Sequence, residues 1–337
     1  MPTVTEIFDS FPHDEKVRTI VRDEDALFTK PQLGPIKLLQ HDNIGKVHFP
    51  VIFEPSKFAR PMGVYESDFL RLEWQKMNFR QPFYHRNADV DEMSYQVFGS
   101  RTLMTEQGSV DLHPGDFSRI PVGAAHDNYG REEIHLLFYV HPKIAECGPV
   151  DRSATFAIPP YPGWESKEVA EVLTNCLGGP ECDISASVSD ETLLLKHAEG
   201  LGGEDLLQVL RAKDDSQGTT WMYKSRDVWI GLTKGHVPAE ADNSTAPPES
   251  RIYRRHRCAE EIQCQIKGTR TIISQRGIIE LKPGDFVSIP VGVAFTEIVH
   301  ETSEHVTVLT AKPTPNAAPL VETAKDSTVS QVRQIFK

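Results

Sequence analysis

The chain has few cysteines, no long apolar run and no excess of basic residues, and each shortage argues against a class of protein. Its five cysteines are an odd number without a Cys-x-x-Cys pair, which is not the pattern of a disulfide framework. No apolar run approaches the ~18 residues of a membrane span. The net charge of −12 opposes binding to nucleic-acid phosphates, which depends on clustered Lys and Arg. We therefore expect neither a nucleic-acid nor a membrane partner.

The composition is that of a globular protein. Hydrophobic residues make up 39% and charged residues 25% of the 337 residues, a length that suggests two domains at roughly 150 residues each. Residues 1–7 are neither basic nor followed by an apolar segment, so they do not resemble a secretory signal. Together with the cysteine pattern, this predicts a cytoplasmic protein.

A long internal repeat is the clearest positive feature. Residues 92–126 recur without a gap at residues 261–295, at one constant offset (261 − 92 = 169). The matching positions include Glu92 and Glu261, Gly99 and Gly268, Arg101 and Arg270, Pro114-Gly-Asp-Phe117 and Pro283-Gly-Asp-Phe286, and Ile120-Pro-Val-Gly123 and Ile289-Pro-Val-Gly292. Solenoid repeats have periods of roughly 20–50 residues, so this longer period indicates a duplicated domain.

Short β-rich runs dominate both copies. Residues 47–53, 93–98 and 134–140 are separated by Gly, Pro and Asp turns, and a second unit of this kind begins near Thr219. This pattern is typical of antiparallel sandwiches and barrels, so we expect an all-β fold. The predicted organisation is an N-terminal domain with the metal site (1–157), a connector (158–215), a C-terminal domain (216–312) and a tail (313–337).

Two helices and one loop are expected outside the barrels. In the connector, Ser166 can cap a helix that ends at Gly178-Gly179, because the apolar residues between them follow helical spacing: Val169, Val172, Leu173, Cys176 and Leu177. The tail predicts a short helix over 329–336. Residues 238–250 are poor in apolar side chains and predict a loop. Loop and tail are either contacts with another subunit or solvated disorder.

Four residues of the first copy form a candidate metal site. His85 and Asn87 share a face of one strand, Glu92 can reach that face from a second strand, and His126 from a third. Two imidazoles and one carboxylate form the facial triad that holds non-heme Fe(II) and leaves positions open. We therefore predict His85, Glu92 and His126 as metal ligands, with Asn87 as a weak fourth ligand or a hydrogen-bond partner of substrate. Polar groups satisfied within a barrel are the alternative interpretation.

These residues carry a resemblance to the cupin superfamily. Gly115-x5-Pro121-x-Gly123-x2-His126 is similar to its second motif, and His85-x-Asn87-x4-Glu92-x6-Gly99 to its first, with Asn in place of a His and Phe79 at a position where Gly is expected. With both motifs present twice, the chain resembles a bicupin. The resemblance implies a duplicated jelly-roll barrel with a metal inside.

A shorter match concerns chemistry. Tyr84-His-Arg-Asn87, followed by a Glu and a distant His, resembles the iron site of homogentisate 1,2-dioxygenases, although the His-to-Glu spacing is one residue longer here. The large subunits of two-component hydroquinone dioxygenases are similar in size and also cupin-like. These resemblances imply Fe(II), O₂, a small aromatic substrate, and either a homo-oligomer or a small partner subunit.

The second copy no longer has a ligand-type residue at two of the four site positions. Arg254, His256, Glu261 and Phe295 stand where the first copy has His85, Asn87, Glu92 and His126. We expect a buried ion pair between Arg254 and Glu261 to fill this site. A shifted metal site built from His256, His300, His305 and Glu260 or Glu261 is the alternative.

Further residues complete the prediction for the first copy. His135 is the best candidate for acid–base work, because its strand follows that of His126; a structural role is the alternative. Gln96 shares the face of Glu92 and is expected to contact substrate. Arg86 should point away from the metal by strand alternation and is read as structural.

Three functions fit this sequence. The first is an Fe(II)-dependent dioxygenase that cleaves a hydroxylated aromatic ring of the hydroquinone, homogentisate or gentisate type. The second is a metal-dependent isomerase or lyase in which the ion acts only as a Lewis acid. The third is a non-catalytic bicupin subunit of a complex. We predict the first, on the ligand set and the Tyr84–Asn87 stretch.

Overall fold

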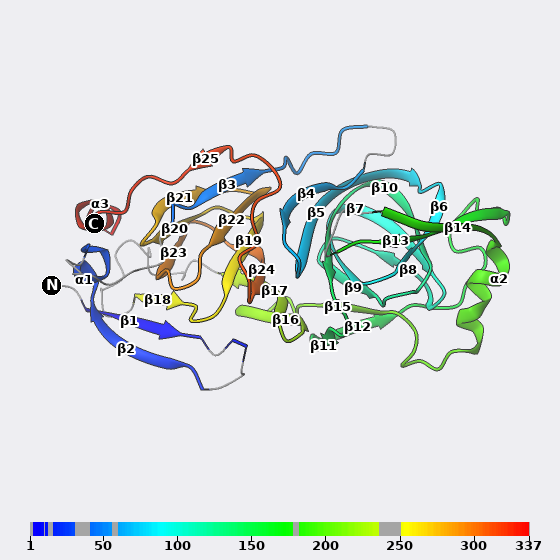
Figure 1. The fold of residues 1–337 in the computed structure, drawn as a ribbon, viewed down its shortest axis with the longest axis horizontal. Helices are drawn as coiled ribbons and strands as arrows, with labels where there is room; N and C mark the ends of the chain where they lie inside the picture. Colours follow the sequence, from blue (N-terminus) through cyan, green and yellow to red (C-terminus); the bar gives the residue numbers. More distant parts are fainter. Residues whose placement is uncertain are drawn as a thin grey trace.

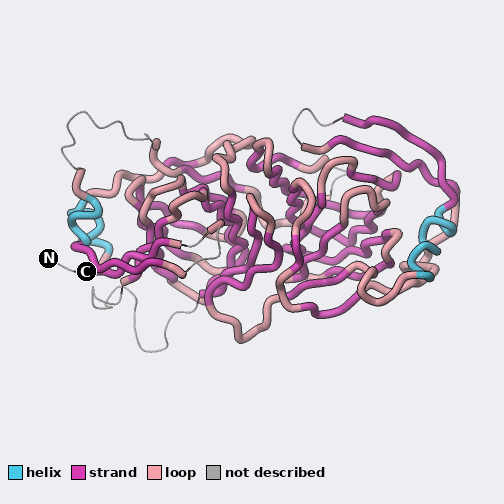
Figure 2. The backbone as a smooth tube through the Cα atoms, turned by 60° about the horizontal axis from the view of Figure 1, so that its bottom comes forward, coloured by secondary structure: helices cyan, strands magenta, loops and turns pink. Residues whose placement is uncertain are grey.

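The computed structural model describes residues 3–9, 11–12, 16–30, 41–55, 60–177, 182–235 and 251–336. Two β-barrels lie side by side along the long axis of the molecule (Figure 1). The helices are short and lie at the two opposite ends, with strands between them (Figure 2). The predicted all-β fold with duplicated jelly-roll barrels is confirmed. Within the described residues, no helix is long and apolar enough to span a membrane.

The first barrel is organised around two long antiparallel strands, β7 and β10, which pair along almost their full length. Side chains on β7 alternate between two buried environments: Met93 and Tyr95 join an apolar core, whereas Glu92, Ser94 and Gln96 point to a polar interior. The strands are β4 (Met62–Glu66), β5 (Leu70–Arg80), β6 (Phe83–Asn87), β7 (Asp91–Thr105), β8 (Gly108–Leu112), β9 (Asp116–Ile120), β10 (His126–Val140) and β12 (Val150–Ser153).

The second barrel repeats the same pairings. His126 lies opposite His85 in the first barrel, and Phe295 lies opposite Arg254 in the second, each at the offset seen in the sequence. The predicted duplication is therefore confirmed at the level of single residue pairs. The strands are β16 (Gly218–Lys224), β17 (Val228–Gly235), β18 (Ile252–Arg255), β19 (Glu260–Lys267), β20 (Arg270–Ser274), β21 (Gly277–Leu281), β22 (Asp285–Ile289), β23 (Phe295–Val299), β24 (Ser303–Thr310) and β25 (Glu322–Thr323); β11 (Ala145–Glu146) pairs with β16.

Each barrel is completed by an arm from the other half of the chain. The N-terminal arm comprises β1 (Thr3–Phe8), β2 (Arg18–Asp23), α1 (Glu24–Phe28) and β3 (Gly45–His48), and it joins the second barrel through β18 and β22. The middle arm comprises β13 (Glu168–Asn175), β14 (Cys182–Asp190), α2 (Glu191–Lys196), a 3₁₀ turn (His197–Gly200) and β15 (Gln208–Arg211), and it joins the first barrel through β6 and β9. The blue arm beside the yellow and orange strands, and the green arm beside the cyan strands, show this exchange in Figure 1.

The predicted domain boundaries are therefore wrong in part. Residues 3–28 belong to the C-terminal barrel rather than to a domain spanning 1–157, and residues 168–211 belong to the N-terminal barrel rather than to a free connector. The predicted boundaries rest on local composition. Pairing between strands that are far apart in the sequence does not alter local composition, so these boundaries could not include it.

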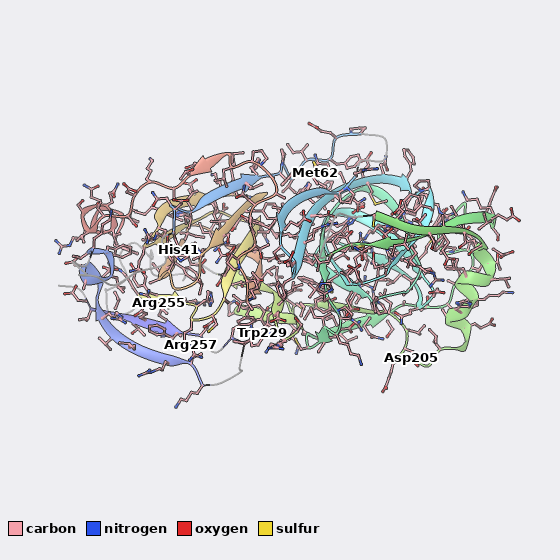
Figure 3. The ribbon with its side chains drawn as sticks, viewed as in Figure 1. His41, Met62, Asp205, Trp229, Arg255 and Arg257 are labelled. Carbon is pink, nitrogen blue, oxygen red and sulfur yellow. The ribbon has the colours of Figure 1, made fainter. Side chains whose placement is uncertain are left out.

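The two arms are themselves copies of each other. Asp23 and Asp190 cap their helices, and the next residue in each arm is a buried glutamate. Glu191 accepts a hydrogen bond from the Tyr84 hydroxyl at 3.0 Å, and Glu24 accepts one from Tyr253 at 2.9 Å. Figure 3 shows Arg255 and Arg257 on the side of the second barrel that faces the N-terminal arm. Arg255 donates to Glu6 of β1 at 2.6 Å, as Arg86 donates to Glu171 of β13.

The helix expected after Ser166 is wrong, because this segment is the strand β13. It pairs in parallel with β6 and antiparallel with β14. The β-branched residues Val169 and Val172 suit a strand, and the two pairings override the helical spacing. The predicted terminus Gly178-Gly179 and the predicted loop 238–250 lie outside the described residues. The tail helix is confirmed as α3 (Val329–Ile335), which begins with a capping box at Thr328.

One apolar core joins the two barrels. The Trp74 indole forms a triangle of rings with Phe49 and Phe286, whose centroids are each 5.9 Å from it and 6.0 Å from each other. This core continues from β5 and β7 of the first barrel to β17, β19 and β24 of the second. Burial of this surface holds the barrels together as one unit.

Phe79 occupies a backbone conformation that normally favours glycine. Its φ of 75° lies in the left-handed region, and its side chain is exposed. The resemblance described above leads us to expect a glycine at this position. A residue other than glycine in this conformation costs of order 1–2 kcal/mol.

Candidate functional site

Three adjacent strands bring the predicted ligands of the first barrel together. β10 lies between β6 and β7, with His126 opposite His85 on one side and opposite Thr105 on the other. Glu92 reaches this region from β7, and Asn87 from β6. All four side chains are mostly or fully buried, so they form a polar patch inside the barrel rather than on its surface.

Glu92 and His126 are in direct contact. His126 Nε2 lies 3.3 Å from Glu92 Oε2, and Asn87 donates to the same oxygen at 2.9 Å. Burial tends to raise the pKa of Glu92, but His126 and Asn87 outweigh it and lower that pKa to about 2. The carboxylate is therefore ionised at neutral pH.

His85 is the third predicted ligand, and its ring lies beside that of His126, with centroids 5.8 Å apart. Its Nε2 is 2.6 Å from the Thr174 hydroxyl of β13. Because Thr174 donates its own hydrogen to Asp183, the hydroxyl accepts from His85 Nε2. Burial, helped by His126, lowers the pKa of His85 to about 4, so its ring is neutral at neutral pH.

The donor set fits a divalent transition metal in its chemistry, and two of its three members also fit in protonation state. Metal binding requires neutral imidazoles and an ionised carboxylate, and His85 and Glu92 are in those states. Burial tends to lower the pKa of His126, but Glu92 outweighs it and raises that pKa, so an ion would have to compete with a proton for His126. In the part of the chain that the structure describes, no group of three or more His, Cys, Asp or Glu has the arrangement of a metal site. A metal would therefore need His85 to give up its hydrogen bond to Thr174.

The other two predicted site residues meet deeper in the barrel. His135 and Gln96 are opposite each other on β10 and β7. His135 Nδ1 lies 2.8 Å from Glu133 Oε2, and Gln96 donates to the same oxygen at 2.9 Å. His135 Nε2 and Gln96 Oε1 are buried without a hydrogen-bond partner. Both residues stay candidates for proton transfer and substrate contact.

Arg101 is a site residue that sequence reasoning missed. It is fully buried, donates to Ser94 at 2.5 Å, and acts electrostatically on His135 together with Glu133 and Glu92. Its repeat partner Arg270 is also fully buried. A basic residue kept at the same repeat position in both barrels was the available signal.

Arg86, by contrast, pairs with Glu106 and Glu171, as its structural interpretation predicts.

The second copy of the site is closed by a different ion pair from the one predicted. His256, rather than Arg254, pairs with Glu261, and its other nitrogen lies 2.5 Å from Asp9 of the N-terminal arm. The reason is the arm itself, which supplies a second carboxylate to His256. The Phe295 ring packs against His256 at 5.9 Å between centroids.

The shifted metal site is not formed by the described residues. His300 is exposed and bonds Thr271, and Glu260 accepts from Ser288. His305 is buried and lies directly opposite Gln265 across the β19–β24 pair. These side chains belong to separate environments.

The His256 cluster predicts a pH-dependent stability. Burial tends to lower the pKa of His256, but Glu261 and Asp9 raise it to about 9 from 6.5. The stabilisation is therefore complete below pH ~6.5 and is lost as the pH rises toward ~9. We expect the free energy of unfolding of the wild type, relative to His256→Gln, to fall by roughly 1–3 kcal/mol over this range, at about 1.4 kcal/mol per pKa unit. Denaturant titrations at each pH measure it.

The matched control is His300→Gln, which removes an exposed histidine of the same barrel. Its difference from the wild type should stay constant across the same range. Parallel pH profiles for the wild type and His256→Gln would contradict the prediction.

Comparison with known proteins gives structural neighbours only. No protein-family model and no curated protein matches the chain. The neighbours are cupin-fold proteins. They include a cupin 2 conserved barrel domain protein from Leptotrichia buccalis, which is 9% identical, covers 81% of this chain and 100% of its own, and has a TM-score of 0.45.

Two further neighbours are similar at the same level. A mutant of Bacillus subtilis oxalate decarboxylase is 13% identical over 83% of this chain and 80% of its own, with a TM-score of 0.44. Protein Ylba from E. coli is 11% identical over 87% of this chain and 99% of its own, with a TM-score of 0.44. Similarity this low says nothing about the reaction or the metal of this chain. The two barrels of this chain are shown by its own strand pairings.

Proposed function

We propose that the first barrel binds one divalent transition metal through His85, Glu92 and His126, and that with Fe(II) it cleaves a hydroxylated aromatic ring with O₂. The observation that carries the proposal is the Glu92–His126 contact, with the His85 ring alongside, on three adjacent strands. Iron held by two imidazoles and a carboxylate supplies redox chemistry and open positions for two further ligands. The substrate class is a hydroquinone, homogentisate or gentisate.

The chain's own residues would orient the substrate and move its proton. Asn87 holds Glu92 in place through its hydrogen bond of 2.9 Å. Where Glu133 accepts from His135 Nδ1–H, the unpartnered Nε2 carries a lone pair and can take the proton of a phenol. Gln96 Oε1 can accept a hydrogen bond from a second hydroxyl. Burial of all these groups excludes water from the reaction.

A second candidate is a non-catalytic bicupin, either alone or as a subunit of a complex. The contact between His85 Nε2 and Thr174 favours it, because it satisfies His85 without a metal. A metal-dependent isomerase or lyase is the third candidate and differs from the first only in the role of the ion.

The test is O₂ uptake by anaerobically purified chain, first loaded with Fe(II) and then, in a separate sample, with Zn(II). We expect oxygen consumption with hydroquinone, homogentisate or gentisate for the Fe(II) sample only, because zinc has no accessible second redox state. Equal turnover with both metals would favour the isomerase or lyase. No metal binding and no turnover, with or without a partner subunit, would leave the non-catalytic bicupin.

A further inference from the structure

The second barrel contains a pocket at the position equivalent to the predicted metal site of the first. It has a volume of ≈ 290 Å³ and includes Arg254 and Phe295, the repeat partners of His85 and His126. Gln263 and His305 also line it. Its remaining wall is mixed: Ile7 of the N-terminal arm, Ile252, Ile298 of β23 and Phe336 after α3 are apolar, and Arg251, Thr296 and Glu297 are polar.

Arg254 supplies a positive charge at this pocket. Its side chain is largely exposed and forms no hydrogen bond or ion pair with any described residue. Of the other cations nearby, Arg251 pairs with Glu24 at 2.7 Å and Arg270 pairs with Glu297 at 2.5 Å. Arg254 is therefore the guanidinium of the pocket wall that no described carboxylate pairs, although Arg251 also keeps its buried Nε without a hydrogen-bond partner.

Two buried polar side chains at the pocket lack a partner. Gln263 is 1% exposed and uses its amide nitrogen to donate to Glu261 at 2.5 Å, which leaves its Oε1 without a donor. His305 is 4% exposed, and its Nδ1 has no hydrogen-bond partner. Buried polar atoms are rarely left unpaired, so both point to a ligand that supplies the missing bonds.

From this geometry we infer that the second barrel binds a small hydroxylated organic acid, with its carboxylate on Arg254, its hydroxyl donating to Gln263 Oε1 and its apolar body against Phe295 and Ile298. Guanidinium and carboxylate form the strong, charge-assisted hydrogen bonds of proteins. His305 can bond either end of the ligand, because a neutral imidazole both donates and accepts. Glu261 and Glu297 bear negative charge nearby, but each already has a cationic partner, His256 and Arg270.

The loss of the metal ligands fits this assignment. Replacing His85 by Arg254 and His126 by Phe295 removes two metal donors and adds a cation and an apolar surface, which are what an aromatic or branched acid needs. The inference does not depend on a metal in the first barrel. The second barrel is then a binding site for an organic acid rather than a metal site that has only been closed by an ion pair.

The experiment is calorimetric titration of the metal-free chain with 4-hydroxybenzoate, and with benzoate and phenol, each of which lacks one polar group. We expect saturable binding of one molecule per chain, at least about tenfold weaker for phenol than for 4-hydroxybenzoate, because phenol lacks the carboxylate for Arg254. Benzoate should bind more weakly than 4-hydroxybenzoate by a smaller factor, since it lacks only the neutral hydrogen bond to Gln263.

Three variants locate the site. Arg254→Gln should weaken 4-hydroxybenzoate at least about tenfold while leaving phenol unchanged. Gln263→Met should abolish the preference for 4-hydroxybenzoate over benzoate. Arg18→Gln, which removes the same charge from an exposed position of the N-terminal arm, should leave all three affinities unchanged. Unfolding midpoints without ligand verify that each variant is folded.

Two results would overturn the inference. One is the absence of saturable binding of all three compounds in the millimolar range. The other is equal affinity of the folded wild type and Arg254→Gln for 4-hydroxybenzoate, which would place any binding elsewhere. Loss of binding in Glu92→Gln with retention in Arg254→Gln would assign it to the first barrel.

Discussion

Replacing His126 by alanine is expected to abolish stoichiometric metal binding and leave both barrels folded. His126 is one of three predicted ligands, and its loss would leave the ion with only two protein ligands, His85 and Glu92. The barrel should survive, because its core consists of apolar residues such as Leu103 and Leu112 on strands that pair without the site. Metal analysis after anaerobic loading measures the stoichiometry, and circular dichroism the fold.

The matched control is His197→Ala. This histidine is exposed, lies in the middle arm and pairs with Glu106 of the same barrel. Its metal content should equal that of the wild type. Full occupancy in His126→Ala would move the metal to another site, with the second barrel as the next candidate.

Glu92→Gln is expected to remove Fe(II)-dependent oxygen consumption almost completely. The substitution keeps the size of the side chain but removes the charge that balances the metal, and an amide oxygen is a weaker ligand than a carboxylate. It also leaves His126 Nε2, now 3.3 Å from a carboxylate oxygen, without its ionic partner. Oxygen uptake and bound iron should therefore fall together.

His256→Ala provides the contrast in the second barrel. His256 lies at the repeat position of Asn87 and pairs with Glu261, the repeat partner of Glu92. If catalysis belongs to the first barrel, this variant should keep most of the activity while losing stability. Comparable activity loss in both variants would show that the reaction depends on the second barrel as well.

The parts of the fold that could be predicted are those where local sequence is decisive. The turn at Gly115 recurs at Gly284, and the strands on either side of each turn recur in the same register. The duplication and the barrel class therefore follow from the repeat alone. The exchange of arms could not be seen in this way. The N-terminal and middle arms share only a few residues at matching places, notably Glu6 and Glu171, and Asp23-Glu24 and Asp190-Glu191.

The interior of the barrels was only partly predictable for a related reason. His135 pairs with Gln96, and His305 pairs with Gln265, so the two histidines are structurally equivalent. Their residue numbers, however, differ by one more than the repeat offset. The first copy has a bulge near Glu132, where φ is 46°, and the second copy has an extra residue before Thr302. A fixed offset therefore hides this pair. The His85–Thr174 contact was hidden as well, because Thr174 comes from the arm.

The exchanged arms also determine when each barrel can close during synthesis of the chain. β13 emerges from the ribosome after its partner β6, so the first barrel can close as soon as β15 has been made. β1 is made long before its partner β18, which begins only at Ile252, so it waits about 12–50 s at ~5–20 residues per second. Throughout that interval the edge of β1 that pairs with β18 has no native partner, although its other edge can already pair with β2. The N-terminal arm is therefore exposed to wrong pairing for most of the synthesis of the second barrel, and it is a segment on which a chaperone would act.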